Sequence, residues 1–212
     1  MHSRPDSVND GPHASGVNDG THPDGVYWLI RPVHEFPSTA SMLAGLPEWR
    51  RRQALSYVRD SDRRQCAAAY LLLVELLERL GIDYDGQPFA LSPRGKPSLA
   101  GHPGTGISIS HCDRAVMAAV ALTGSVGCDI ETVPEVPDYD VCRLVFGPRE
   151  ADRVARSEAP SATFAAMWTE REALAKMLDA DLTDVGQPLP ADASCQRGTA
   201  LGCAWCVVTM PW

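Results

Sequence analysis

Two carboxylates stand two positions apart at the end of an apolar segment. Asp129 and Glu131 close residues 126–131, whose composition is typical of a β-strand. Side chains at positions i and i+2 point to the same face of a strand, so these carboxylates would lie side by side. Mg²⁺ prefers such oxygen ligands and commonly shares them with substrate phosphates. The alternative is a solvated strand face that carries two acids, and the pair alone leaves both interpretations open.

A third carboxylate belongs to the strongest helical pattern in the second half of the chain, residues 161–178. Glu172 and Lys176 are four residues apart and therefore share one flank of this helix. They could form an ordinary surface ion pair worth about 0.3 to 0.5 kcal/mol. They could also provide a carboxylate for metal or proton chemistry beside a lysine for phosphate. Arg171 falls within the apolar stripe, where a charged side chain must either reach out to water or meet an anion, and this favours the second interpretation.

Two shorter motifs precede these residues. Gly95, Lys96 and Pro97 form a loop in which glycine permits close backbone approach to a ligand and proline fixes the exit. Ser110 and His111 end a short alternating strand. A serine hydrolase is not indicated, because the chain contains no G-x-S-x-G segment.

Strands and helices must position these side chains, and their patterns recur in both halves of the chain. We expect strands at 26–33, 107–110, 115–122, 126–131 and 202–210, with the middle three in a meander, and helices at 48–58, 62–80, 148–156 and 161–178. The fold class is therefore α+β or α/β. Polar residues 1–24 are expected to be a disordered tail, followed by two α/β halves at 25–124 and 125–212.

The composition excludes several classes of protein. Nonspecific nucleic-acid binding needs a basic surface, whereas this chain has a formal net charge of -8. No apolar run is long enough for a membrane span, and the first residues lack the apolar core of a signal peptide, so we expect a cytoplasmic protein. The seven cysteines are expected to be reduced and mostly buried. Cys203 and Cys206 should point to opposite faces of a strand, which does not suit a metal site.

Together the motifs resemble those of a known family. The segments Val126-Gly127-Cys128-Asp129-Ile130-Glu131 and Trp168-Thr169-Glu170-Arg171-Glu172-Ala173-Leu174-Ala175-Lys176 resemble the paired signature of 4'-phosphopantetheinyl transferases. The motifs at 95–97 and 107–111 resemble two upstream motifs of that family, in the same order. The resemblance covers roughly residues 26–190, and the length points to the Sfp type, a monomer of two similar halves with pseudo-twofold symmetry.

The resemblance implies an activity, and with it a substrate, a metal and a partner. Such enzymes transfer 4'-phosphopantetheine from coenzyme A to a serine of an apo acyl or peptidyl carrier protein and release 3',5'-ADP. This reaction activates polyketide, nonribosomal peptide or fatty acid synthases. The implied metal is Mg²⁺, with Mn²⁺ as an alternative.

The resemblance also implies roles for individual residues. The implied metal ligands are Asp129, Glu131 and Glu172. Glu172 would also be the base, and Lys176 would stabilise the leaving phosphate. The implied coenzyme A contacts are Arg52, Arg64, Gly95, Lys96, Pro97, Ser110, His111 and Lys176.

The sequence departs from the family pattern at two places. Arg171 stands where the family has lysine, and Asp179 and Asp181 stand where it has a glycine-rich turn with a basic residue. Acids near a phosphate site are unexpected. Two alternatives therefore stay open: a coenzyme A-binding homologue without transferase activity, and a Mg²⁺-dependent phosphohydrolase.

Overall fold

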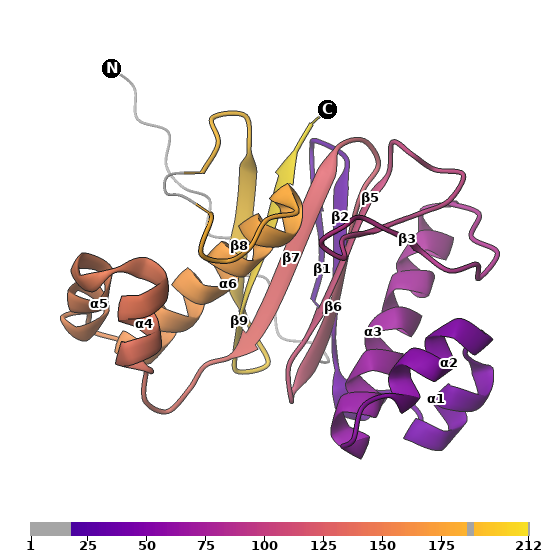
Figure 1. Cartoon of the computed structure of the whole chain (residues 1–212), viewed down its shortest axis with the longest axis horizontal. Helices are drawn as coiled ribbons and strands as arrows, with labels where there is room; N and C mark the ends of the chain where they lie inside the picture. The colour runs from indigo at the N-terminus through magenta and orange to yellow at the C-terminus, as the bar shows by residue number, and fades with distance from the viewer. Residues whose placement is uncertain (1–17, 186–188, 212) are drawn as a thin grey trace.

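A computed structural model describes residues 18–185 and 189–211 (Figure 1). The first half contains a six-stranded antiparallel sheet in the order β1-β2-β6-β5-β4-β3. Its strands are β1 Asn18–His22, β2 Val26–Pro32, β3 Ala90–Leu91, β4 Pro97–Ser98, β5 Gly106–His111 and β6 Ala115–Ala121. Every residue of β6 is buried, so this strand forms the centre of the half.

A long helix covers this sheet. The helices of the first half are the 3-10 turn η1 Val33–Glu35, α1 Thr39–Gly45, α2 Glu48–Leu55 and α3 Asp60–Arg79. Two aspartates in the first turn of α3 favour the helix start, because its amide end carries a partial positive charge. Gly81, at φ 68°, follows its end and reverses the chain. The apolar face of α3, including Leu72, Leu73 and Leu77, is fully buried in the core of this half.

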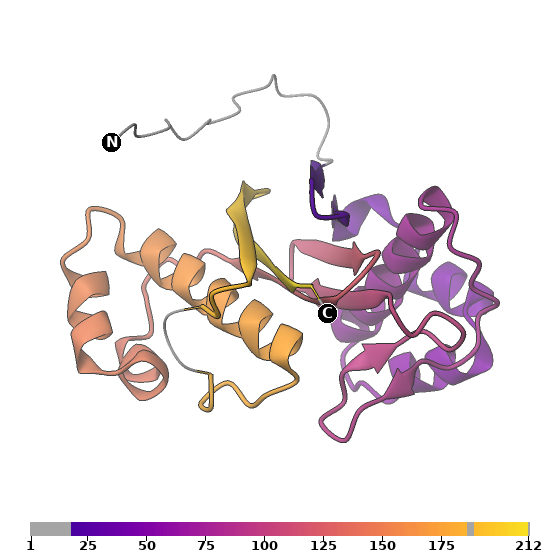
Figure 2. The same ribbon diagram turned by 90° about the horizontal axis from the view of Figure 1, so that it is seen from above.

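The second half has a smaller sheet with the order β7-β9-β8. Its elements are β7 Ser125–Thr132, α4 Tyr139–Phe146, α5 Pro148–Ala155, α6 Pro160–Leu178, β8 Ser194–Ala200 and β9 Cys203–Met210. Apart from η1 and the short strands β1, β3 and β4, both halves run from a strand through three helices to two further strands, and the last strand lies between the other two. The short helices α1 and α2 lie at one end of the molecule and α4 and α5 at the other (Figures 1 and 2).

The two sheets meet where β5 runs beside β7. The backbone amide of Cys128 donates to the Ser108 hydroxyl at 2.9 Å, so a side chain takes the place of a backbone acceptor at this contact. The prediction of a three-strand meander is wrong for its third strand, β7. β5 and β6 pair as predicted, but β7 pairs with β9 in the second sheet. The junction brings residues of both halves together.

Most of the predicted elements are confirmed, and the fold is a mixed α+β fold whose described strand pairs are all antiparallel. The sequence missed β1, α1, β3, β4, α4 and β8, which are short or strongly polar. Residues 1–17 of the predicted disordered tail lie outside the described residues. Residues 18–22 form β1 instead of disordered chain, because they pair with residues 26–30 of β2.

The cysteine predictions hold. All seven cysteines are free, and six of them are buried. Cys203 faces Cys112 across the junction of the halves, with their sulfurs 3.6 Å apart, whereas Cys206 faces Cys195 at 3.5 Å on the other side of β9. The two residues of the C-x-x-C segment thus point to opposite faces, as expected. Within the described residues, the helices are too short or too polar to cross a membrane.

Candidate active site

The site forms where β7 packs against α6. A side chain at Gly127 could not be accommodated, because a Cβ atom there would stand 2.0 Å from the carbonyl oxygen of Ala173. Glycine therefore lets the strand approach the helix backbone directly. This close approach carries Asp129, two residues further along β7, to Glu172 and Lys176 on the helix.

Asp129 is the centre of this contact and is only 1% exposed. Its Oδ1 accepts hydrogen bonds from the Lys176 ammonium at 2.6 Å and from the Ser110 hydroxyl at 2.7 Å. The Lys176 ammonium also lies 3.5 Å from Glu172 Oε2. The predicted grouping of Asp129, Glu172 and Lys176 is thus found, and Ser110 from the first half joins it. We call Asp129, Glu131, Glu172 and Lys176 the carboxylate cluster.

The carboxylate cluster contains three acidic groups and one basic group. Burial, followed by the charges of Asp129 and Glu172, raises the pKa of Glu131 to about 8. Burial and the Asp129 charge raise the pKa of Glu172 as well. Burial opposes the charge of Lys176, but its carboxylate neighbours prevail and raise its pKa to about 12. One ammonium group therefore compensates three acids only in part.

The carboxylate cluster offers the oxygen ligands that a hard divalent cation needs, but its side chains are not yet arranged around one point. Asp129 Oδ2 is buried and has no hydrogen-bond partner within the part of the chain that the structure describes. Carboxylate oxygens are the donors that Mg²⁺ and Mn²⁺ prefer. Among residues 18–185 and 189–211, however, no three His, Cys, Asp or Glu side chains are gathered as a ready metal site. The Lys176 ammonium holds Asp129 in this arrangement, so the residues fit a metal if that ammonium moves aside.

A cavity of about 650 Å³ extends from Glu172 and Lys176 along the junction of the halves. A smaller cavity of about 270 Å³ lies on the other side of these two side chains and contains Ser110, His111, Asp129 and Glu131. Gly95, Lys96 and Pro97 line the larger one. The pKa of His111 is lowered by burial and by the charges of Lys176 and Arg50, which favours a neutral imidazole.

Lys96 makes contacts that the sequence did not predict. Its ammonium donates to the carbonyl oxygens of Lys176 at 2.5 Å, Met177 at 2.9 Å and Val126 at 3.1 Å. Burial lowers its pKa to about 8. Since these acceptors belong to the end of α6 and the start of β7, Lys96 joins the first half of the molecule to the second.

The two unexpected acids are paired across the same junction. Asp179 ends α6 in the left-handed conformation, at φ 53°, and accepts a 2.9 Å hydrogen bond from the Ser92 hydroxyl. Asp181 accepts from Arg94 at 3.1 Å, and Asp184 lies 3.8 Å from that guanidinium. We call this part of the cavity, between residues 92–97 and 179–184, the loop end. Its acids are matched by partners in the first half.

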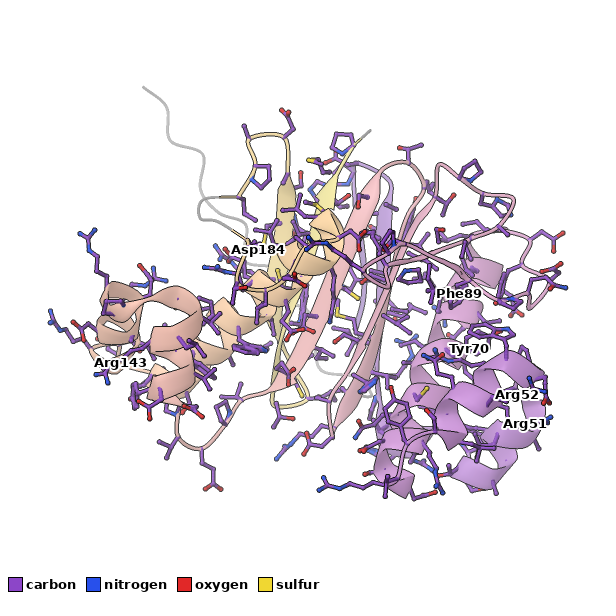
Figure 3. All side chains as sticks on the ribbon, in the orientation of Figure 1. Arg51, Arg52, Tyr70, Phe89, Arg143 and Asp184 are labelled. Atoms are coloured by element: carbon purple, nitrogen blue, oxygen red, sulfur yellow. The ribbon has the colours of Figure 1, made fainter. Side chains whose placement is uncertain are left out.

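Two predicted basic contacts lie away from the cavities. The Arg52 side chain is 77% exposed, bonds to Glu48 and points outward at the edge of the molecule (Figure 3). Arg64 donates to the carbonyl oxygens of Val33, Phe36 and Pro37, and it lines a different cavity. The structure therefore does not bring either residue to the carboxylate cluster or the loop end.

Arg50 is the basic residue that α2 contributes instead. It is 5% exposed and lines both cavities of the site. Its guanidinium bonds to the Cys66 carbonyl at 2.9 Å and to Gln53 at 2.7 Å, but its Nε has no partner within the described residues. Ala54, four residues later, is fully buried. That spacing places Arg50 on the inward face of α2, a signal that the sequence contained.

Comparison with protein families finds a match in the second half of the chain. Residues 125–199 match the family model of the 4'-phosphopantetheinyl transferase superfamily. The matched segment includes the whole carboxylate cluster and extends into β8, but it excludes the first half of the chain. No curated protein matches the chain. The class that the site and this match define is a 4'-phosphopantetheinyl transferase superfamily domain in residues 125–199.

Proposed function

We propose that the protein is an Sfp-type 4'-phosphopantetheinyl transferase that modifies a serine of an apo acyl or peptidyl carrier protein, with coenzyme A as donor. The observation that carries this proposal is the meeting of Asp129 with Glu172 and Lys176 at the head of a cavity between two halves. The order β2, α1 to α3, β5 and β6 in the first half recurs as β7, α4 to α6, β8 and β9 in the second, and this recurrence supports a pseudo-twofold arrangement of 25–124 and 125–212.

The donor would lie along the larger cavity. Arg50 supplies a buried guanidinium with an unused Nε, and guanidinium groups match phosphate oxygens well. The loop at 95–97 supplies a wall of the cavity, with Lys96 acting on α6 through its carbonyl bonds. The pyrophosphate would then reach the carboxylate cluster, where Asp129, Glu131 and Glu172 would hold Mg²⁺ or Mn²⁺. The metal, when bound, neutralises phosphate charge.

The chain's own residues provide the proton chemistry. The carrier serine hydroxyl attacks the phosphorus that carries the pantetheine arm, and the bond from that phosphorus to the oxygen of 3',5'-ADP breaks. Glu172 accepts the serine proton, since its carboxylate lines both cavities of the site. Lys176 stabilises the charge on the departing phosphate. Positioning and charge stabilisation are the main requirements of such a transfer.

The paired acids of the loop end bear on the alternatives. Asp179 and Asp181 weakened the case for an active transferase, because they departed from the family pattern beside a phosphate site. Ser92 fixes the position of Asp179, and the Arg94 guanidinium offsets part of the negative charge of Asp181. Loss of activity is therefore not favoured by this departure.

One experiment separates the transferase from both alternatives. The protein is incubated with coenzyme A, Mg²⁺ and an apo carrier domain, and the carrier is weighed by mass spectrometry. The proposal predicts a mass gain of one phosphopantetheine group together with 3',5'-ADP release. Release of 3',5'-ADP with an unmodified carrier would indicate a phosphohydrolase. Coenzyme A binding without either product would indicate a binding protein.

A further inference from the structure

A further cavity lies behind α6, on the side that faces away from the carboxylate cluster. Its volume is about 560 Å³, and α4, α5, α6 and β8 enclose it. Neighbouring helix positions differ by about 100° in direction, so Arg171 turns into this cavity although Glu172 belongs to the carboxylate cluster. The charged side chains that line it are Arg149, Glu150, Arg153, Glu170, Arg171 and Arg197.

Arg171 is the buried member of this lining, at 6% exposure. One nitrogen donates to the Val185 carbonyl, and the guanidinium lies over the Phe146 ring with 5.2 Å between Cζ and the ring centroid. Its Nε is buried and has no hydrogen-bond partner within the described residues. Arginine keeps its charge even when buried, so a buried guanidinium without a carboxylate is unfavourable until an anion approaches.

The carboxylates of the cavity do not form ion pairs with Arg171, because each of them pairs with another arginine. Glu150 pairs with Arg153 at 2.8 Å, and Glu170 pairs with Arg197 at 2.5 Å. Neither Arg149 nor Arg171 forms an ion pair with a carboxylate within residues 18–185 and 189–211, and Glu170, whose charge also acts on Arg171, is shared with Arg197. The cavity is therefore a positive region in a chain whose formal net charge is -8.

Arg149 is also poorly placed for the stability of its own helix. It lies in the first turn of α5, where the partial positive charge of the helix end disfavours a cation. It is exposed, so it can turn toward a ligand without disturbing the core. Its position is unfavourable for α5 alone but suitable for closing the cavity over an anion.

We propose that this cavity binds a small phosphate-class oxyanion, either orthophosphate or a phosphate monoester. Arg171 would form the fixed inner wall and Arg149 the outer contact. Planar guanidinium groups offer paired donors that match the oxygens of a phosphate. The apolar side chains of Phe146, Met167 and Val185 keep the inner wall away from water and strengthen this interaction. A concave site of about 560 Å³ suits a small anion better than an acidic protein surface. The inference does not rest on the proposed transferase activity.

Calorimetric titration of the full-length protein with inorganic phosphate tests this site. Arg149→Ala removes the outer guanidinium, and Arg143→Ala is the matched control. Arg143 is an exposed arginine of the neighbouring helix α4 (Figure 3), lies outside the cavity, and has its nearest carboxylate, Asp140, at 3.9 Å. Both substitutions change the net charge equally. We expect Arg149→Ala to weaken phosphate binding about tenfold or more, the scale of one charge-assisted contact, and Arg143→Ala to leave it unchanged.

Phosphate could also bind at the carboxylate cluster. A second measurement therefore compares variants that differ only outside that cluster. Thermal unfolding is followed in phosphate and in chloride of equal ionic strength. We expect phosphate to raise the unfolding temperature more in wild type and Arg143→Ala than in Arg149→Ala. Equal phosphate responses in all three proteins would overturn the proposal, as would the absence of saturable binding to wild type. Binding of an acidic peptide where phosphate does not bind would also overturn it, because the ligand class would then be a protein.

Discussion

The two ends of the proposed coenzyme A cavity are built from different kinds of contact. At the carboxylate cluster, Asp129, Glu172 and Lys176 come from a strand and a helix of one half that pack directly against each other. At the loop end, Lys96 and Arg94 reach from the first half to the carbonyls and acids of the second. The first arrangement follows from local spacing on two elements, whereas the second exists only if the halves are assembled.

The ends also differ in how completely their polar groups are satisfied. The acids of the loop end have partners, and the ammonium of Lys96 has three acceptors. The carboxylate cluster keeps a buried oxygen of Asp129 without a partner and holds Glu131 with a raised pKa. Unsatisfied buried groups are a common property of sites that bind a ligand. From this contrast we infer that the carboxylate cluster carries out the reaction and that the loop end holds the two halves together.

The largest expected effect is that of Asp129→Asn, which keeps the shape of the side chain but removes its charge. We expect transfer to the carrier to fall by about a hundredfold or more, because phosphoryl transfer depends on charge stabilisation at this position. The rate of carrier mass gain measures it. Asp140→Asn, at a side chain 98% exposed on α4, is the control and should keep the wild-type rate. Similar rates for all three proteins would contradict the assignment.

The next effect compares two neighbouring arginines of α2. Arg50→Lys should raise the KM for coenzyme A about tenfold, because a point charge replaces a planar fork that lines both cavities. Arg52→Lys should change it less than twofold, since that side chain is exposed and bound to Glu48. Steady-state kinetics at fixed carrier concentration gives both values, and thermal unfolding checks that Arg50→Lys is folded. A larger effect at Arg52 would reverse the assignment.

Lys96→Met tests whether the loop end serves assembly. We expect a loss of about 1 to 3 kcal/mol in the free energy of unfolding, because three buried carbonyls lose their donor. The pKa of Lys96 is lowered to about 8 from 10.5, so between these pH values the unfolded chain binds a proton that the folded protein lacks. The Lys96 contribution to the free energy of unfolding therefore rises with pH across this window.

Urea unfolding at several pH values measures this contribution. The rise between pH 8 and 10.5 should be present in wild type and smaller in Lys96→Met. Identical slopes in the two proteins would show that Lys96 is not buried at the junction as described. A substitution that leaves stability intact but weakens coenzyme A binding would instead favour a direct phosphate contact.

The smallest effect is expected at the exposed ion pairs of the loop end. Arg94 and Asp181 have side chains 49% and 72% exposed, and exposed pairs contribute about 0 to 1 kcal/mol. Arg94→Ala should therefore lower stability by less than about 1 kcal/mol and change the KM for coenzyme A less than threefold. Thermal unfolding and kinetics at low and high salt measure this. A tenfold change in KM would mean that Arg94 binds the donor.

The sequence predicted the carboxylate cluster because its members follow local rules. Asp129 and Glu131 share a face through the strand period, and Glu172 and Lys176 share one through the helix period. Patterns of this kind repeat within one element and need no knowledge of the rest of the chain.

The remaining contacts depend on assembly, and the sequence could not specify them. The spacing of Arg50 from Ala54 points it inward on α2, but only the packing of α3 supplies the Cys66 carbonyl that it binds. β7 pairs with β9, which lies far along the chain, and it meets β5 through the bond from the Cys128 amide to the Ser108 hydroxyl. Asp179 and Asp181 looked unfavourable in the sequence because their partners, Ser92 and Arg94, lie 87 residues away along the chain.

The central claim is that Glu172 completes a metal site with Asp129 and Glu131, and Mn²⁺ binding in the presence of coenzyme A tests it most directly. Free Mn²⁺ is followed by electron paramagnetic resonance for wild type, Glu172→Gln and Glu170→Gln. Glu170 is the matched control, because its carboxylate pairs with Arg197 behind the same helix. The account predicts Mn²⁺ binding to wild type and Glu170→Gln, with strong weakening in Glu172→Gln. Equal affinity of all three proteins for Mn²⁺ would contradict it.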